Sequence, residues 1–154
     1  MAGGHLIDAP TDLQIYSSQV KPISTKLIGV IADKLGLKKL CGDVSNAYVN
    51  AKTPHKVYVK KAGPKFGSRA GQIIIIRIAL YGLTASGADW HRNFSSTLRS
   101  IGFSPTRFDR YVWIKLADSG DFYEYICTYV DNFLITSGFL DAIKKSSTYV
   151  QMYS

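Results

Sequence analysis

The sequence predicts an α+β fold in which antiparallel strands form a sheet and helices pack on one face of it. Three observations lead to this prediction. Two segments carry apolar residues at helical spacing, and short strand-like segments lie between and after them. Short turn signals join the last strands, as in an antiparallel meander. Finally, 154 residues with 46% hydrophobic and 19% charged content suit one globular domain.

The first predicted helix begins near residue 24 and ends at Gly36. Ser24 is suited to cap its N-terminus, and glycine is a common residue just after a helix. One apolar stripe is expected on this helix, formed by Leu27, Ile28, Ile31 and Leu35. Residues 37–44 then predict a strand, and residues 45–48 a short turn or helix.

Two further strands are expected at residues 57–59 and 73–80, with a loop at residues 62–67 between them. A turn at residues 81–83 leads into a second helix, capped by Thr84 or Ser86 and ended by Gly102. The spacing of four apolar residues marks the buried face of that helix: Trp90, Phe94, Leu98 and Ile101.

The C-terminal part predicts two antiparallel hairpins. Residues 111–116 and 122–130 form strands joined by a turn at residues 118–121. Residues 133–136 return after Asp131-Asn132, a residue pair typical of two-residue hairpin turns.

The net charge of +8 is concentrated in the middle of the chain. No aspartate or glutamate occurs between Val44 and Ala88. That stretch holds Lys52, Lys56, Lys60, Lys61, Lys65, Arg69 and Arg77. Such a block suits a polyanion, either nucleic acid or a nucleoside triphosphate, and equally suits a merely solvated basic face.

The sequence argues against export and membrane insertion. Its N-terminus lacks the charged and apolar regions of a signal peptide, and its longest aliphatic run, around Ile73–Ile76, is too short to span a bilayer. Cys41 and Cys127 have no metal-ligand spacing and are expected to be free thiols. We therefore expect a protein that is not secreted.

Two aspartates occur where strands are expected to end. Asp43 closes one strand, and Asp131 lies at a hairpin tip. Carboxylates on neighbouring strand ends form a hard-oxygen site suited to Mg²⁺, and two ions about 3.5–4 Å apart would support phosphoryl transfer. Each aspartate also has a simple structural explanation, as a strand terminator or a turn former.

Four motifs in order resemble those of copia-type retrotransposon reverse transcriptases. The run Gly42–Tyr48 resembles the family's first catalytic motif, and Ala79-Leu80-Tyr81-Gly82-Leu83, followed by Ser86 and Trp90, resembles its Ala-Leu-Tyr-Gly-Leu block. Gly102-Phe103 with Asp109 is similar to the run that follows, and Tyr129-Val130-Asp131-Asn132 to the Tyr-Val-Asp-Asp box. The resemblance extends from about Tyr16 to Ser137.

This resemblance implies a polymerase palm-like sheet with partial fingers and RNA-directed DNA synthesis. It implies two Mg²⁺ or Mn²⁺ ions, held by Asp43 and Asp131, and partners in the form of an RNA template, a DNA primer, dNTPs and other parts of a gag-pol polyprotein. The catalytic positions would be Asp43, Asp131 and Asn132. Those matching the nucleotide pocket are Val44, Tyr48, Tyr81, Gly82 and Ser86; the ring at Tyr48 would pack under the deoxyribose. The resemblance also implies a location in cytoplasmic virus-like particles or in the nucleus.

The chain departs from the family pattern in its turn and at its ends. Asn132 stands where the family has a second aspartate, so one carboxylate is lost from the expected metal site. We expect residues 1–15 to be irregular, residues 16–140 to form the palm and partial fingers, and residues 141–154 to be a truncated segment with no thumb. Impaired polymerase activity is therefore expected, with a non-catalytic nucleic-acid-binding remnant as the alternative.

Overall fold

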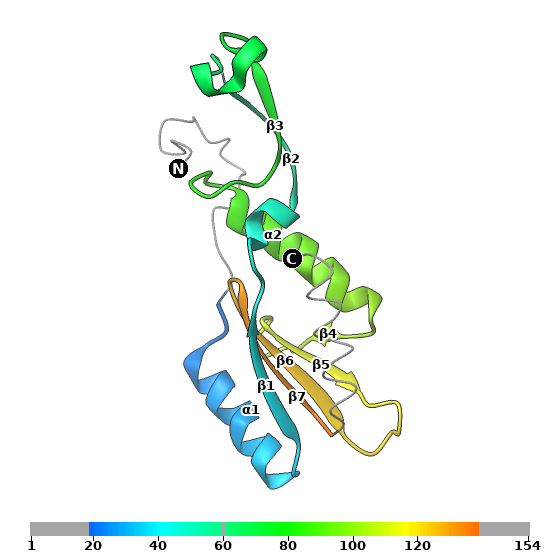
Figure 1. Cartoon of the computed structure of the whole chain (residues 1–154). Coiled ribbons are helices and arrows are strands. Elements are labelled where there is room, and N and C mark those ends of the chain that lie inside the picture. Colours follow the sequence, from blue (N-terminus) through cyan, green and yellow to red (C-terminus); the bar gives the residue numbers. More distant parts are fainter. Residues whose placement is uncertain (1–18, 60, 139–154) are drawn as a thin grey trace.

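The structure is a computed structural model and describes residues 19–59 and 61–138 (Figure 1). Two antiparallel sheets are present in this part of the chain. The larger sheet has the order β1-β7-β6-β5-β4, and the smaller pairs β2 with β3. Their bounds are β1 (Lys38–Asp43), β2 (Lys52–Val59), β3 (Ile74–Ile78), β4 (Ser104–Pro105), β5 (Val112–Leu116), β6 (Tyr123–Tyr129) and β7 (Asn132–Ser137). The α+β class with antiparallel strands is confirmed. The expected segments 1–15 and 141–154 lie outside the described residues.

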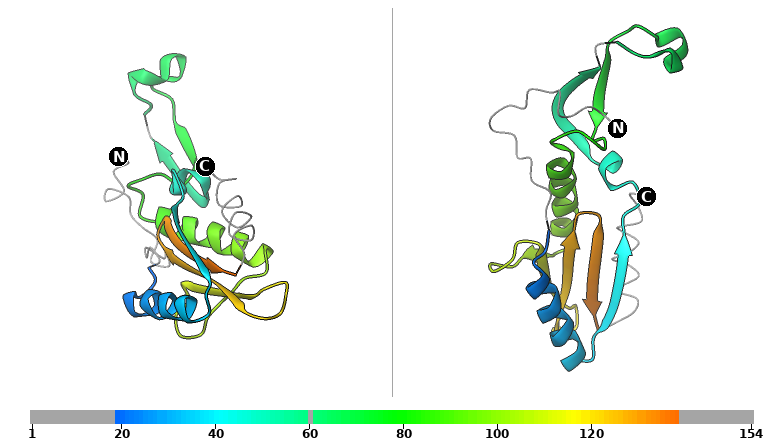
Figure 2. Two further views of the ribbon diagram at one scale, coloured as in Figure 1. Left: turned by 60° about the horizontal axis from the view of Figure 1, so that its bottom comes forward. Right: turned by 90° about the vertical axis from the view of Figure 1, so that its left-hand side faces the viewer.

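Helices α1 (Pro22–Lys34) and α2 (Ser86–Ser100) cover opposite faces of the larger sheet (Figure 2). Trp113 and Ile126 pack in one core with α2, whereas Val112 and Cys127 pack in a second core with Ile28 of α1. Neighbouring residues of a strand point to opposite faces. The prediction of helices on one face is therefore wrong. Its physical reason is that β5 and β6 carry apolar residues at consecutive positions, so both faces of the sheet are buried.

The N-cap of helix α1 lies three residues before the expected one, Ser24. Lys21 occupies the N-cap position without a side-chain bond, and Pro22 begins the helix. Ser24 lies inside the helix, where it is buried. The buried face consists of Ser24, Ile28 and Ala32, while Leu27 and Leu35 of the expected stripe are 47% and 57% exposed. The stop at Gly36, which has φ 65°, is as predicted.

Helix α2 has the buried face that the sequence predicts, but not the predicted cap. Trp90, Phe94 and Leu98 are buried. Ala85 occupies the N-cap, and the hydroxyl of Ser86 instead bonds both backbone groups of Leu80, at 3.1 Å from the amide and 2.7 Å to the carbonyl. Ser86 thus closes the turn that precedes the helix.

The β2–β3 hairpin projects from the larger sheet (Figure 1). Strand β2 is longer than predicted, and its pairing with β3 shifts register between Lys52 and Val57. Two short 3₁₀ helices flank it, η2 (Ala47–Asn50) before β2 and η3 (Pro64–Arg69) at the far end. None of the helices within residues 19–59 and 61–138 has the length and apolar character needed to cross a membrane.

Gly42 lies directly opposite Phe133 in the β1–β7 pair, and the phenyl ring covers it. A Cβ at Gly42 would lie 2.3 Å from Cζ of Phe133, whose side chain is buried. We expect Gly42→Ala to lower the free energy of unfolding by about 1–3 kcal/mol, because a buried ring must move. Urea denaturation measures this. Gly29→Ala is the control, since a Cβ there meets nothing within 4 Å; equal effects of the two substitutions would refute the close packing.

Candidate metal and nucleotide site

The β6–β7 turn is one residue earlier than the sequence predicts. Tyr129 and Asn132 form the last strand pair, so Val130 and Asp131 are the turn residues and Asn132 is the first residue of β7. Val130 has φ 58°, which is unfavourable for a β-branched residue. The indole Nε1 of Trp90 donates a hydrogen bond of 2.8 Å to the carbonyl oxygen of Val130. Helix α2 therefore holds the strained turn in place.

The end of β1 meets this turn. Asp43 lies directly opposite Asn132, and the amide of Val44 donates to the carbonyl oxygen of Asp131 at 2.9 Å. Directly opposite residues of an antiparallel pair point to the same face and lie about 4.5–5.5 Å apart at Cβ. The fold thus brings together the three positions predicted as catalytic, although 88 residues separate the two aspartates in sequence.

The amide of Asn132 is bonded to the neighbouring carboxylate. Its Nδ2 donates to Oδ1 of Asp131 at 3.1 Å. A carboxylate at this position could only accept hydrogen bonds or bind a cation, whereas an amide supplies a donor that occupies one oxygen of Asp131. The side chains of Asp43 and Asn132 are exposed, and that of Asp131 is half-buried.

Two tyrosines lie beside the aspartates. The rings of Tyr48 and Tyr81 have centroids 4.7 Å apart and planes tilted by 34°. Burial raises the pKa of Tyr81, and electrostatic interactions with Asp131, Tyr48 and Asp43 raise it further, while a backbone hydrogen bond involving Tyr48 lowers it. The influence of both carboxylates on this pKa indicates that the Tyr81 hydroxyl is near them. Tyr81 is 46% exposed, so its ring is available to a ligand.

The remaining positions predicted for the nucleotide pocket, Val44, Ser86 and Gly82, have no exposed side chain that could contact a nucleotide. Val44 is 3% exposed and belongs to the α2-side core, and Ser86 is 1% exposed. Neither side chain presents a surface to a nucleotide. Gly82 has φ 96° in the turn before α2, a conformation that favours glycine. Only backbone groups at these positions could contact a ligand without rearrangement.

The basic block lies on the projecting hairpin and η3. Lys52, Lys61, Lys65, Arg69 and Arg77 are all exposed. Lys60 and the side chain of Lys56 lie outside the described part of the structure. The hairpin therefore presents a cationic surface well separated in the fold from the larger sheet (Figure 1).

Comparison with known proteins settles the ancestry of this arrangement. Residues 8–152 match the family model described as reverse transcriptase (RNA-dependent DNA polymerase). The chain belongs to this reverse transcriptase family. It is similar to the retrovirus-related Pol polyprotein from transposon TNT 1-94 of Nicotiana tabacum, with 26% identity over 123 residues, which cover 79% of this chain and 9% of the relative. No solved structure matches the chain. The resemblance to copia-type enzymes is thereby confirmed.

Reverse transcriptases generally use divalent metal ions, and two carboxylates of this family member could contribute to holding one. Asp43 and Asp131 supply carboxylate oxygens, the ligands that Mg²⁺ prefers. Within residues 19–59 and 61–138, no group of three His, Cys, Asp or Glu residues could hold a metal. Asn132 offers one neutral carbonyl oxygen where the family pattern has a third carboxylate. The donor set therefore suits metal binding but carries less negative charge than the family pattern requires.

Two residues have supporting roles that the sequence did not predict: Trp90 positions the β6–β7 turn, and Asp109 caps α1. The bond from Trp90 to Val130 positions the turn, although the spacing of Trp90 indicated only a core residue. Asp109 accepts bonds from the Ser24 hydroxyl at 2.6 Å and the Lys21 amide at 2.9 Å, and so caps α1 from another part of the chain. Asp109 was noticed as part of a family motif, but no local pattern connects it with residues 21–24.

Proposed function

We propose that this chain is a reverse transcriptase domain whose nucleotidyl-transfer site is weakened by Asn132. The observation that carries the proposal is the meeting of Asp43 at the end of β1 with Asp131 and Asn132 at the β6–β7 turn. A carboxylate at the end of one strand and another in the adjoining turn would form a site for a divalent cation and the phosphates it binds.

Each element would have a defined task in the reaction. Asp43 and Asp131 would hold Mg²⁺ or Mn²⁺, which would supply the Lewis-acid chemistry of phosphoryl transfer when bound. The adjacent rings of Tyr48 and Tyr81 offer an aromatic surface beside the carboxylates for the sugar and base of a dNTP. The cations of the β2–β3 hairpin would contact phosphates of the RNA template and DNA primer without reading sequence.

Asn132 is expected to reduce nucleotidyl transfer without destabilising the fold. It fits at the start of β7 and bonds Asp131. Removing one negative charge from a site that must hold divalent cations reduces both metal affinity and stabilisation of the phosphoryl transition state. The proposed substrates and a polyprotein context follow the family, and we propose virus-like particles in the cytoplasm, or the nucleus, as the place of action.

A non-catalytic nucleic-acid-binding role is the second proposal, and the amide at position 132 together with the exposed basic hairpin favours it. Binding to nucleic acid needs the cations but not the carboxylates. Its signature is affinity that falls steeply with salt, shows little sequence preference and is accompanied by no nucleotide incorporation.

Primer extension tests the first proposal. With an RNA template, a labelled DNA primer, dNTPs and Mg²⁺ or Mn²⁺, we expect the natural chain to give little or no product, because its metal site lacks a carboxylate. An active retroviral polymerase on the same template is the positive control. Efficient extension by the natural chain would show that Asn132 does not impair the site. Because the natural chain is expected to give little or no product under either proposal, Asn132→Asp separates them: extension that appears in this variant supports the first proposal. Salt-sensitive oligonucleotide binding with no extension by either chain favours the second.

A further inference from the structure

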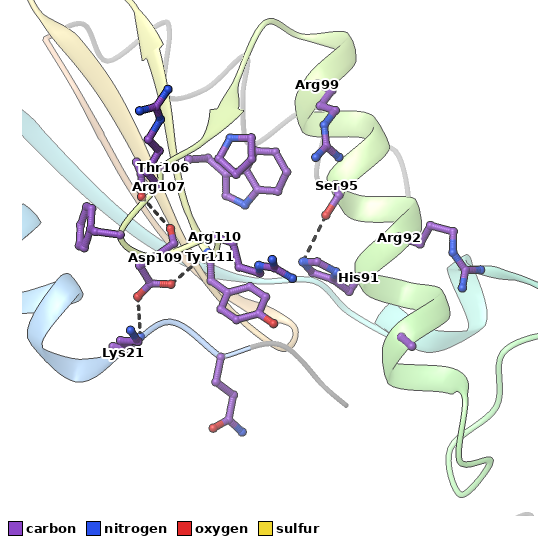
Figure 3. A pocket seen from close by; sticks show the side chains of 15 residues that line it. Lys21, His91, Arg92, Ser95, Arg99, Thr106, Arg107, Asp109, Arg110 and Tyr111 are labelled. Carbon is purple, nitrogen blue, oxygen red and sulfur yellow. Dashed lines mark hydrogen bonds between the residues drawn. The ribbon is translucent and has the colours of Figure 1, made fainter. Parts of the chain in front are cut away.

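A basic cavity lies between α2 and the segment joining β4 to β5, and the proposed reaction does not use it. Its volume is about 1040 Å³, at the upper end of the range for ligand sites. Its walls are formed by α2, the segment joining β4 to β5, and the residues before α1 (Figure 3). The lining cations are Lys21, Arg92, Arg99, Arg107 and Arg110. None of the catalytic or nucleotide positions discussed above contributes to this lining.

The positive charge of the cavity is poorly neutralised. Within residues 19–59 and 61–138, Asp109 is the only carboxylate that lines the cavity, and its oxygens accept bonds from Ser24, Lys21 and Tyr111. Arg92 pairs with Asp89 at 3.0 Å. In the described part of the chain, no carboxylate lies within ion-pair distance of Arg99, Arg107 or Arg110. Guanidinium groups without a carboxylate partner around a concave site favour anions with several oxygen atoms.

The pKa of His91 is affected by the same cations. Its ring bonds Ser95 at 3.3 Å and lies edge-on to Tyr111, with centroids 5.3 Å apart. Burial lowers the pKa of His91, and the positive charges of Arg110 and Arg99 lower it further. In Figure 3 the Arg110 side chain points toward this ring from the loop, while Arg99 lies on the helix. The charges of Arg99 on α2 and of Arg110 on the β4–β5 segment therefore both act on the His91 ring.

An exposed aromatic ring among the cations favours a nucleic-acid strand, rather than a free phosphate compound, as the ligand of this cavity. Phe108 is 53% exposed at the cavity and could stack with a base, whereas Trp113, whose ring centroid lies 5.2 Å from Arg99, is buried and only supports that arginine. Exposed aromatic rings among cations form the stacking and phosphate surface of single-strand binding sites. Gln19, which also lines the cavity, pairs with Tyr129 next to the β6–β7 turn. The lining of the cavity thus includes a residue that is paired with the last residue of β6.

We propose that this cavity binds phosphates of a single nucleic-acid strand, with Arg107 and Arg110 as contacts from the β4–β5 loop. It is a second phosphate-binding surface, distinct from the β2–β3 hairpin. The inference deepens the proposed nucleic-acid role but requires neither metal binding nor catalysis. A chain that fails in primer extension can still bind in this way, so the two proposals fail independently.

The test compares binding of a fluorescein-labelled 20-nucleotide oligothymidine by fluorescence anisotropy across NaCl concentrations. Arg107→Gln/Arg110→Gln should weaken binding roughly tenfold at low salt, and the salt slope should fall by about 1.4, because each lost phosphate contact contributes about 0.7 for single strands. The matched control is Lys26→Gln/Lys34→Gln, which removes two exposed charges from α1, outside the cavity. The control should change affinity by less than about twofold. Equal losses in the two variants would overturn the proposal.

A site-specific readout separates the possible ligands. The ring resonances of His91, assigned with a His91→Gln variant, should shift when the oligonucleotide is added to the natural chain. Pyrophosphate and polyglutamate serve as comparison anions. A His91 shift with pyrophosphate but not with the oligonucleotide would overturn the choice of a strand. Competition by polyglutamate as strong as by the oligonucleotide would overturn the choice of phosphate.

Discussion

Replacing Asn132 with aspartate is expected to tighten binding of Mn²⁺ by tenfold or more. The new carboxylate would lie opposite Asp43 and next to Asp131, and it would replace the amide that now donates to Oδ1 of Asp131. An added negative charge a few ångströms from a divalent ion is worth more than the about 1.4 kcal/mol that a tenfold change requires. Electron paramagnetic resonance of free Mn²⁺ during a titration gives the affinity.

The same substitution should destabilise the metal-free chain, because three carboxylates would then lie at one edge of the sheet. Mn²⁺ should restore the loss, so the melting temperature of Asn132→Asp should rise with Mn²⁺ more than that of the natural chain. Gln72→Glu is the matched control, since it makes the same amide-to-carboxylate change at an exposed position before β3. Equal Mn²⁺ affinity in Asn132→Asp and Gln72→Glu would show that position 132 is not at a metal site.

Asp109→Ala is expected to lower the free energy of unfolding by about 3 kcal/mol. This buried carboxylate, 4% exposed, joins the start of α1 to the segment before β5 through bonds from Ser24, Lys21 and Tyr111. Loss of a buried charged acceptor leaves several donors without a partner. Urea denaturation at neutral pH measures the change. Asp118→Ala, at a side chain that is 96% exposed, should cost little.

The pH dependence of the free energy of unfolding is a second test of the role of Asp109. Burial raises the pKa of this carboxyl, but the hydrogen bonds from Ser24, Lys21 and Tyr111 outweigh burial, so the net pKa is lowered from 3.8. Because the pKa is lower in the folded chain, the ionised carboxylate stabilises the fold fully at pH values above 3.8. This stabilisation is lost as the pH falls through the lowered pKa of the folded chain. Asp109→Asn should flatten that part of the stability profile. An unchanged profile would contradict the assigned role of the carboxylate.

Much of the local structure could be predicted because it depends on periodicity and on residues with strong backbone preferences. Trp90, Phe94 and Leu98 recur at the spacing of one helix face, and they are buried there. Gly36 ends α1 with a positive φ, as glycine commonly does after a helix. The hairpin that carries Asp131 was also predicted, although its turn lies one residue earlier.

The unpredicted features depend on contacts between distant parts of the chain. Ser24 resembles an N-cap in sequence, yet its hydroxyl bonds Asp109, 85 residues away. Val130 adopts a positive φ in the turn, and the distant Trp90 anchors it. The cavity cations come from three segments whose proximity only the folded sheet creates. No local pattern encodes such contacts. The wrong prediction that both helices cover one face has a different cause, because the consecutive apolar residues of β5 and β6 that bury both faces are visible in the sequence.

The central claim is that Asp43 and position 132 belong to one metal site that Asn132 weakens, and a double-substitution cycle tests it most directly. Mn²⁺ affinity is measured for the natural chain, Asp43→Asn, Asn132→Asp and the double variant. If both side chains hold the same ion, the gain from Asn132→Asp should largely disappear when Asp43 is absent. An equal gain in the presence and absence of Asp43 would contradict a shared site.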